Sequence, residues 1–149
     1  ADLVDITRVR RLVECEALRD SMLNADAAWE HRVRNAMAAL RNERMEAQDA
    51  GVRFLASDWE AAHEAFHAAL LSNCSSPMLL RNSAELREKA ARYRHLSVKR
   101  PSRRNVLKEH SSLAHAVLDR DVIAACEMLS AHIQKTTTLV IDATFMPGV

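Results

Sequence analysis

The stretch that decides the fold is Trp59-Glu-Ala-Ala-His-Glu-Ala-Phe-His-Ala-Ala-Leu70. His63 and His67 are four positions apart, a spacing that places both imidazoles on one face of a helix. His110 and His132 lie on the apolar faces of two later helical segments. A buried imidazole needs partners for its ring nitrogens. Four that face inward from three helices therefore predict one shared polar group inside a bundle, and a metal ion is the simplest candidate.

The composition is typical of a helical protein. The 149 residues include only two glycines and three prolines, so there is little from which to build hairpins. The net charge of +1 gives no global field for nucleic acid or membrane, and no run approaches the ~20 apolar residues of a membrane span. The three cysteines form no close-spaced pair and are interpreted as buried free thiols, which predicts a cytoplasmic protein.

Hydrophobic spacing predicts an all-α protein, an antiparallel bundle of about six helices with the metal site in its core. Capping residues predict three of the helix starts. Ser57–Glu60 has the pattern of a capping box, and Ser76 precedes Pro77, which occupies a first helical position. Asp121 is expected to cap the last helix. No strand is predicted, and residues 141–149 are expected to be a loose tail. The helices are expected over about 3–22, from 24 or 26 to 49, from a start around 54–58 to 72, and over 77–97, 103–119 and 121–140.

The segment His63-Glu64-Ala65-Phe66-His67 also matches H-E-x-x-H, the zincin motif, in which two histidines bind zinc and the glutamate is the general base. A small helical zinc hydrolase that uses Glu64 is therefore an alternative function. A zincin normally supplies a sheet edge for its substrate, which this sequence does not predict. No nucleophile–base pair stands out elsewhere, so the sequence favours a protein that is not an enzyme. A purely structural helical interaction domain is the third possibility.

Two groups of basic residues have two interpretations each. Residues 89–108 contain eight Lys or Arg and no Asp or Glu. This segment is interpreted either as a surface that binds phosphate or another protein, or as a solvated helix end and loop. The solvated helix end and loop is the favoured interpretation. In the first helix, one of Arg10 and Arg11 is expected to point inward. A buried arginine beside a metal pocket would suit carboxylate recognition.

Several segments, in order, match one family pattern. They are the first helix Ile6–Ala17, Phe66-His67-Ala-Ala-Leu70, Pro77-Met-Leu-Leu80, Glu109-His110 through Asp121, and a histidine in the final helix, His132. Together they resemble the FCD domain, the C-terminal effector-binding domain of the FadR subfamily of GntR transcriptional regulators. The resemblance covers about residues 3–140, so residues 1–149 are expected to form a single FCD-like ligand-sensing domain.

The resemblance implies a ligand set. In that family an Asp four residues before the Phe-His histidine, together with three histidines, binds a metal, and these positions fall on His63, His67, His110 and His132. His63 departs from the usual Asp, and the loss of a negative charge shifts the preference toward Zn or Ni and away from Mn. Ser76 departs from the usual Asn in the turn. The ligand-binding arginine of the family falls on Arg10.

The resemblance also implies a function, a metal-dependent sensor of small organic acids in a bacterial transcriptional regulator. The effector would be a small carboxylate that contacts the metal and Arg10. The resemblance further implies an N-terminal winged-helix DNA-binding domain, which is expected to be absent from this chain; the start at Ala1 without Met fits that expectation. DNA would be bound only through that missing domain, no membrane is involved, and the protein is expected to be a homodimer.

Overall fold

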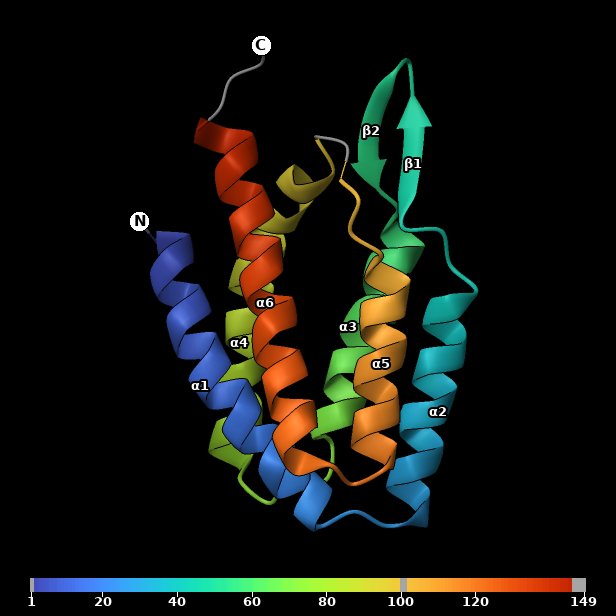
Figure 1. Cartoon of the computed structure of the whole chain (residues 1–149), viewed down its shortest axis with the longest axis vertical. Helices are drawn as coiled ribbons and strands as arrows, with labels where there is room; N and C mark the ends of the chain where they lie inside the picture. The colour runs from blue at the N-terminus through green and yellow to red at the C-terminus, as the bar shows by residue number, and fades with distance from the viewer. Residues whose placement is uncertain (1, 100–101, 146–149) are drawn as a thin grey trace.

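The described residues of the computed structural model, 2–99 and 102–145, form six α-helices, one 3-10 helix and two strands (Figure 1). In chain order these are α1 (Asp2–Leu23), α2 (Ala27–Arg41), β1 (Glu46–Asp49), β2 (Val52–Leu55), α3 (Ser57–Leu71), α4 (Pro77–Arg94), η1 (His95–Val98), α5 (Val106–Leu118) and α6 (Val122–Phe145). The prediction of an all-α bundle of about six helices is confirmed, and the hairpin is an addition to it.

Side chains at the helix starts explain most of the helix boundaries. Asp26 accepts a hydrogen bond from the backbone of α2, Ser76 accepts one from Leu79 N at 3.2 Å, and Asp121 accepts one from Ala124 N at 3.1 Å. The capping box at Ser57 was a wrong prediction, because α3 begins at Ser57 itself and Ala56, at the cap position, makes no side-chain cap bond.

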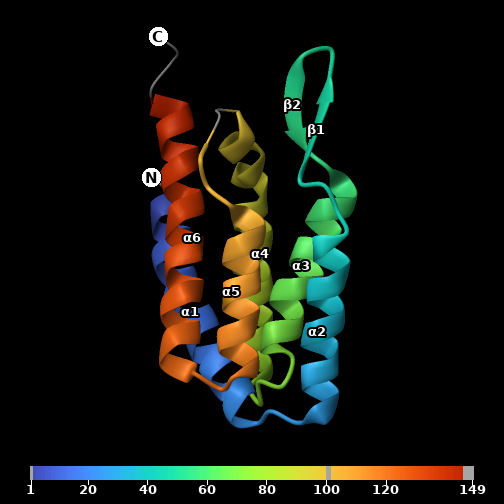
Figure 2. The same ribbon diagram turned by 45° about the vertical axis from the view of Figure 1, so that its right-hand side comes forward.

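The second helix is shorter than predicted. It ends at Arg41 rather than near 49, and residues 46–55 form an antiparallel hairpin in which Glu46 pairs with Leu55 and Asp49 with Val52. Ala50 and Gly51 both have positive φ, +50° and +79°, which is the geometry of a type I′ turn. The absence of strands was therefore a wrong prediction. The hairpin projects at the end of the bundle where α6 ends (Figures 1 and 2).

Three other predicted boundaries shift. The fourth helix ends at Arg94 and continues as η1 to Val98, and the fifth begins at Val106 behind its cap Asn105 rather than near 103. Residues 141–145, expected in the tail, extend α6 to Phe145, whereas the predicted tail residues 146–149 lie outside the described residues. Across the described ranges, no helix combines the length and apolar character needed to cross a membrane.

The helices pack around a core that leaves room for a polar centre. α1 packs against α4 and α6, α2 against α3, and α5 against α6 and α2. Large apolar side chains fill the core, among them Trp29, Phe66 and Leu113. Trp29 Nε1 also donates to Leu70 O at 3.2 Å, which ties α2 to α3. Helices α3, α5 and α6 thus face one another along the middle of the molecule.

Candidate metal and ligand site

The four predicted histidines lie together. His63 and His67 come from α3, His110 from α5 and His132 from α6, and all four are buried. Each offers one nitrogen, and these nitrogens all lie within 4.8 Å of one another. Two nitrogens bound to one ion lie at most about 4.2 Å apart, twice a typical Zn–N distance. The cluster is therefore slightly wider than a bound ion would require.

The rings pack tightly against one another. His63 Nε2 lies 3.1 Å from His67 Nε2, and the His110 and His132 rings meet edge to face with their centroids 4.4 Å apart. Trp59 stacks on His63 at 4.6 Å and 16°, so one turn of α3 fixes the orientation of that ring. Two Nε2 atoms at 3.1 Å repel each other unless one carries a proton or both lone pairs face a cation.

Groups on the outer side of two rings, His110 and His132, bear on their tautomers. His110 Nδ1 lies 2.8 Å from Val106 O, an acceptor, so Nδ1 carries the proton. His132 Nδ1 lies 3.1 Å from Glu109 Oε1 and 3.0 Å from an Arg104 nitrogen; because Nε2 must be unprotonated to bind a metal, we assign the Nδ1 proton to the bond with Glu109. Arg104 then donates to Glu109 Oε1 and to His132 O, at 2.9 and 3.2 Å. Both histidines thereby present an unprotonated Nε2.

Two of the ring nitrogens lack partners. His63 Nδ1 and His110 Nε2 are buried and make no hydrogen bond to any described residue. A buried polar atom without a partner costs about 1–3 kcal/mol, so such atoms call for an explanation. A soft or borderline divalent cation fits this donor set, because neutral imidazole is a common ligand of Zn and Ni.

Burial keeps these imidazoles neutral. Desolvation lowers the pKa of His63 and His67 well below its usual value, with neighbouring positive charges adding to the effect. Desolvation likewise lowers the pKa of His132, and it lowers the pKa of His110 to about 3. Neutral imidazole is the form that binds a metal, so these histidines are in the metal-binding form at neutral pH.

We predict that acid destabilises the metal-free chain. The unfolded chain gains protons on these histidines near pH 6.5, whereas the folded chain takes them up only at lower pH. Stability is therefore retained above pH 6.5 and falls below it, by about 1.4 kcal/mol per pH unit for each such histidine. Urea unfolding at pH 7.5, 6 and 5 measures this effect. A free energy of unfolding that stays constant over that range would contradict it.

Three arginines surround the histidines. Arg10 and Arg94 are buried, and Arg104 reaches the edge of the cluster from the segment before α5. Burial is the main cause that lowers the pKa of Arg94, and the positive charge of Arg10 is the next. Each of the three also pairs with a carboxylate, Arg10 with Glu14, Arg94 with Glu60 and Arg104 with Glu109, so they offer hydrogen-bond donors to an anion rather than an excess of positive charge.

A buried ion-pair network holds Arg10 in place. Arg10 Nε lies 3.3 Å from Glu14 Oε2, while the other Glu14 oxygen accepts from Arg87 at 3.2 Å. Arg87 also donates to both oxygens of Glu64, at 2.9 and 3.1 Å. No hydrogen bond joins the terminal nitrogens of Arg10 to any residue that the structure describes. The network thus contacts the Arg10 guanidinium through Nε and leaves its two terminal nitrogens to bind a ligand.

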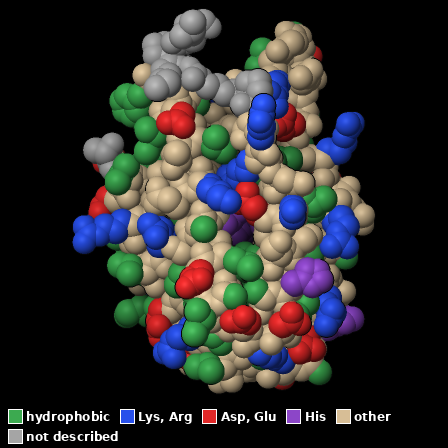
Figure 3. All heavy atoms as spheres, in the orientation of Figure 1, with side chains coloured by type: hydrophobic (Ala, Val, Ile, Leu, Met, Phe, Trp, Pro, Cys, Tyr) green, Lys and Arg blue, Asp and Glu red, His purple; other side chains and the backbone are tan. Residues whose placement is uncertain are grey.

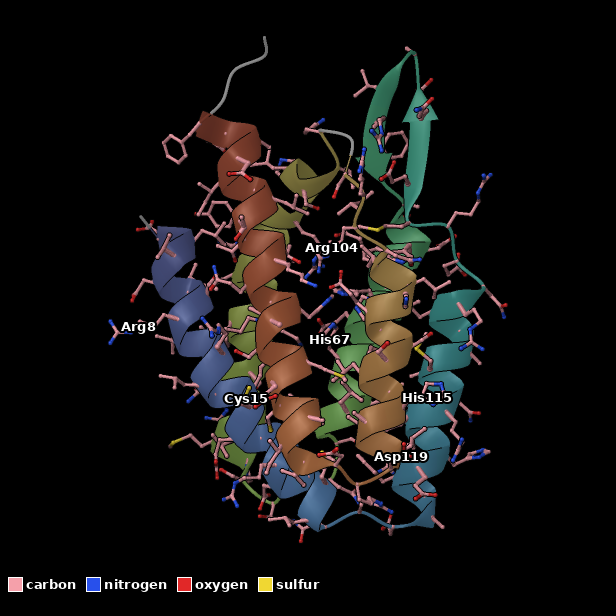
Figure 4. The ribbon with its side chains drawn as sticks, in the orientation of Figure 1. Arg8, Cys15, His67, Arg104, His115 and Asp119 are labelled. Atoms are coloured by element: carbon pink, nitrogen blue, oxygen red, sulfur yellow. The ribbon has the colours of Figure 1, made fainter. Side chains whose placement is uncertain are left out.

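The cluster opens to the surface beside α5 and α6. A pocket of about 540 Å³ is lined by Arg104, Glu109, His132, Lys108 and Lys135, among others. In Figure 3 this face is hollowed, and a histidine is visible at the bottom of the hollow. In Figure 4, Arg104 and His67 lie in the gap between α5 and α6. The interior space beside Arg10 and Arg94 is small, about 10 Å³.

The sequence located some of these residues and missed others. The four histidines come together, and the expectation that one of Arg10 and Arg11 points inward is confirmed, because Arg10 is buried and Arg11 is exposed. The interpretation of residues 89–108 as a solvated surface was wrong for Arg94 and Arg104; Arg100 and Pro101 lie outside the described residues. Glu109 was not predicted as a site residue. Its position next to His110 in the sequence is a signal that could have identified this carboxylate as a neighbour of the histidine cluster.

The comparisons with known proteins agree on one kind of protein. Residues 5–135 match the model of the FCD domain family. The chain is 38% identical over 143 residues to an uncharacterized HTH-type transcriptional regulator, BphR, of Paraburkholderia xenovorans, covering 93% of this chain and 57% of BphR. It is 33% identical over 141 residues to the HTH-type transcriptional repressor GlaR of Escherichia coli, covering 89% of this chain and 61% of GlaR. The relatives are named as regulators, not as enzymes.

A solved structure shares the fold. The crystal structure of a transcriptional regulator, a GntR family member from Pseudomonas syringae pv. tomato, aligns with a TM-score of 0.76 at 20% identity. The alignment covers 97% of this chain and 58% of that one. This chain therefore spans less than two thirds of the length of each of these three proteins.

Proposed function

This chain belongs to the FCD domain family, and from that premise we propose that it is the effector-binding domain of a GntR-type transcriptional regulator. In this proposal His63, His67, His110 and His132 hold one divalent metal ion, Zn or Ni, and the metal and Arg10 bind a small carboxylate. The observation that carries the proposal is the buried set of four imidazole nitrogens within 4.8 Å of one another. In the same cluster two ring nitrogens, His63 Nδ1 and His110 Nε2, make no hydrogen bond to any described residue.

The charge of the site supports an anionic ligand. A metal held by four neutral imidazoles keeps its full positive charge, and in a buried site a cation attracts an anion far more strongly than in water. When bound, the metal would supply that fixed charge. Arg10 offers a fork of two donors that matches a carboxylate, and Glu14 orients it. Arg94 of α4 and Arg104 of the segment before α5, paired with Glu60 and Glu109, add further hydrogen-bond donors.

Ligand binding would be linked to DNA binding through α1. Arg10 lies on α1, whereas the histidines lie on α3, α5 and α6. A ligand that contacts both groups favours arrangements in which α1 sits close to the histidine cluster. The relatives continue beyond the matched region, and we propose that a DNA-binding domain joined to α1 responds to this change. A homodimer belongs to the same proposal; Val4 and Leu12 on the outer face of α1 are exposed apolar side chains that fit such an interface.

The zinc hydrolase alternative is less well supported. Glu64, its general base, is bound through both oxygens by Arg87 of α4. These bonds hold the carboxylate toward α4. On the helix, Glu64 follows His63 by one position, which rotates it by about 100° away from the imidazoles. The relatives named as transcriptional regulators also disfavour catalysis.

We predict that Arg10→Ala weakens carboxylate binding about ten- to a hundredfold, because loss of a charge-assisted contact costs about 1.5–3 kcal/mol. Calorimetric titration of metal-loaded protein with mono- and dicarboxylates measures this change. Arg10→Lys should bind less tightly than the wild type, because a lysine keeps the charge but lacks the fork. Arg8→Ala is the matched control, since Arg8 is exposed and points away from the bundle (Figure 4). Equal affinity in the wild type and Arg10→Ala would exclude Arg10 from the ligand site.

We predict that Glu109→Gln lowers metal affinity about ten- to a hundredfold, as is typical when a carboxylate that orients a histidine ligand is lost. The amide cannot hold the Nδ1 proton of His132 as strongly, so Nε2 becomes a weaker donor. Competition with a chromophoric chelator measures the affinity. Glu127→Gln, an exposed change on α6, should leave it unaltered. If both variants bind metal equally well, Glu109 has no part in positioning the ligand.

A further inference from the structure

Two cysteines meet where α1 packs against α6. Cys15 of α1 and Cys126 of α6 face each other at the seam between the two helices: Cys15 Sγ lies 3.5 Å from Cys126 O, and Cys126 Sγ lies 3.6 Å from Cys15 O. Each sulfur thus approaches the backbone of the other residue. Such a reciprocal approach requires the two residues to lie side by side, as a disulfide does. Figure 4 shows Cys15 where α1 passes α6.

Close contact between the two helices extends beyond the cysteines. Thr7 of α1 and Thr137 of α6 are joined by a hydrogen bond of 2.6 Å between their hydroxyls. Arg11 of α1 donates to Ser130 and Gln134 of α6, at 2.7 and 3.0 Å. These contacts all lie on one side of the cysteines, toward the start of α1 and the end of α6, and they hold the two helices in register there.

The pair is accessible and lies in a basic environment. Both cysteines are half-buried and line a surface pocket of about 600 Å³. The other residues of the pocket are Arg8, Arg11, Leu12, Glu16, Arg19 and Ser130. Positive charge around a partly exposed thiol favours the thiolate, which is the reactive form. The third cysteine, Cys74, is buried and lies outside this pocket.

We propose that Cys15 and Cys126 form a reversible disulfide when the protein meets a hydroperoxide. This site is independent of the proposed metal and carboxylate site. The disulfide would link the helix that carries Arg10 to the helix that carries His132. Oxidation of this pair would therefore act on two of the helices that surround the cluster.

The two thiols have different roles. The hydrogen bond from Cys15, reinforced by Arg19, lowers the pKa of Cys126 to about 7, whereas the same pairing and burial raise the pKa of Cys15. The Cys126 thiolate attacks one peroxide oxygen; the S–O bond forms, the O–O bond breaks, and the leaving oxygen takes a proton. Cys15 then attacks that sulfur, giving the disulfide and releasing water with its own proton. In sum, two thiols and one hydroperoxide give a disulfide, an alcohol (water when the peroxide is H₂O₂) and a water.

Hydrogen peroxide, followed by alkylation and mass spectrometry of the folded chain, tests the proposal. The three free cysteines should fall to one alkylatable thiol per chain, with a linked peptide that contains Cys15 and Cys126, and dithiothreitol should restore all three. Thermal denaturation should shift to higher temperature on oxidation and return on reduction, because the cross-link constrains the unfolded chain.

Serine variants assign the roles of the thiols. Cys15→Ser should stop at a sulfenic acid on Cys126 that dimedone traps, Cys126→Ser should form no intrachain disulfide, and Cys74→Ser should behave as the wild type. Circular dichroism of each variant verifies that it is folded. Full alkylation of Cys15 and Cys126 after peroxide treatment, or a disulfide that forms only in denaturant, would overturn the proposal. Dimedone labelling of Cys74 alone would do the same.

Discussion

Replacing Glu14 by Ala should lower the free energy of unfolding by about 3–5 kcal/mol, the usual cost of removing one partner from a buried ion pair. Glu14 is 1% exposed and contacts two buried arginines, Arg10 and Arg87. Without its carboxylate, Arg10 keeps no ion pair among the described residues, and Arg87 keeps only the partly exposed Glu64. A chain of this length should then melt roughly 10–20 °C lower.

Chemical denaturation monitored by circular dichroism measures this change. Glu16→Ala is the matched control, because Glu16 lies two residues away on the same helix and pairs with the exposed Arg19, so its loss should leave stability unaltered. Glu14→Gln keeps the shape of the side chain and loses its charge. Its free energy of unfolding should lie between those of Glu14→Ala and Glu16→Ala. If Glu14→Ala is as stable as Glu16→Ala, the network does not hold α1 against α4.

Replacing His67 by Ala should abolish stoichiometric binding of zinc or nickel. The His67 ring packs against the other three: its Nε2 lies 3.1 Å from His63 Nε2, and the ring stacks on His132 with centroids 5.4 Å apart. Its removal deletes one donor and leaves a gap at the centre of the cluster, so the remaining imidazoles no longer surround an ion. Elemental analysis after dialysis against a weak chelator should give about one metal per chain for the wild type and close to none for the variant.

A surface histidine provides the control for this prediction. His115 is exposed on α5 and lies away from the cluster (Figure 4), so His115→Ala should retain the metal content of the wild type. Equal metal content in His67→Ala and the wild type would exclude the cluster as the binding site. Loss of metal in both variants would instead indicate weak binding to surface histidines.

The sequence predicts the bundle because helical periodicity and caps act locally. The i, i+4 pair of His63 and His67 and the inward face that includes His110 follow directly from that periodicity. The hairpin could not be predicted in the same way. Its turn uses Ala50-Gly51 rather than Asn-Gly, and two four-residue strands carry almost no alternating pattern.

The polar contacts of the site were harder to predict than its histidines. Glu14 and Arg87 are 73 residues apart, so their pairing depends on how α1 and α4 pack rather than on any local pattern. Long basic side chains can reach either inward or to solvent from the same backbone position. Arg94 and Arg104 therefore looked like part of a solvated basic stretch, although both turn toward the cluster.

The central claim is that the four histidines bind one metal ion, and crystallographic anomalous scattering from zinc-loaded protein tests it most directly. Difference maps recorded on either side of the zinc edge locate the ion without reference to any assumed ligand. The account predicts a single strong peak among His63, His67, His110 and His132, about 2.0–2.2 Å from each donor nitrogen. Fully zinc-loaded crystals with no peak there, or with zinc only at surface side chains, would contradict it.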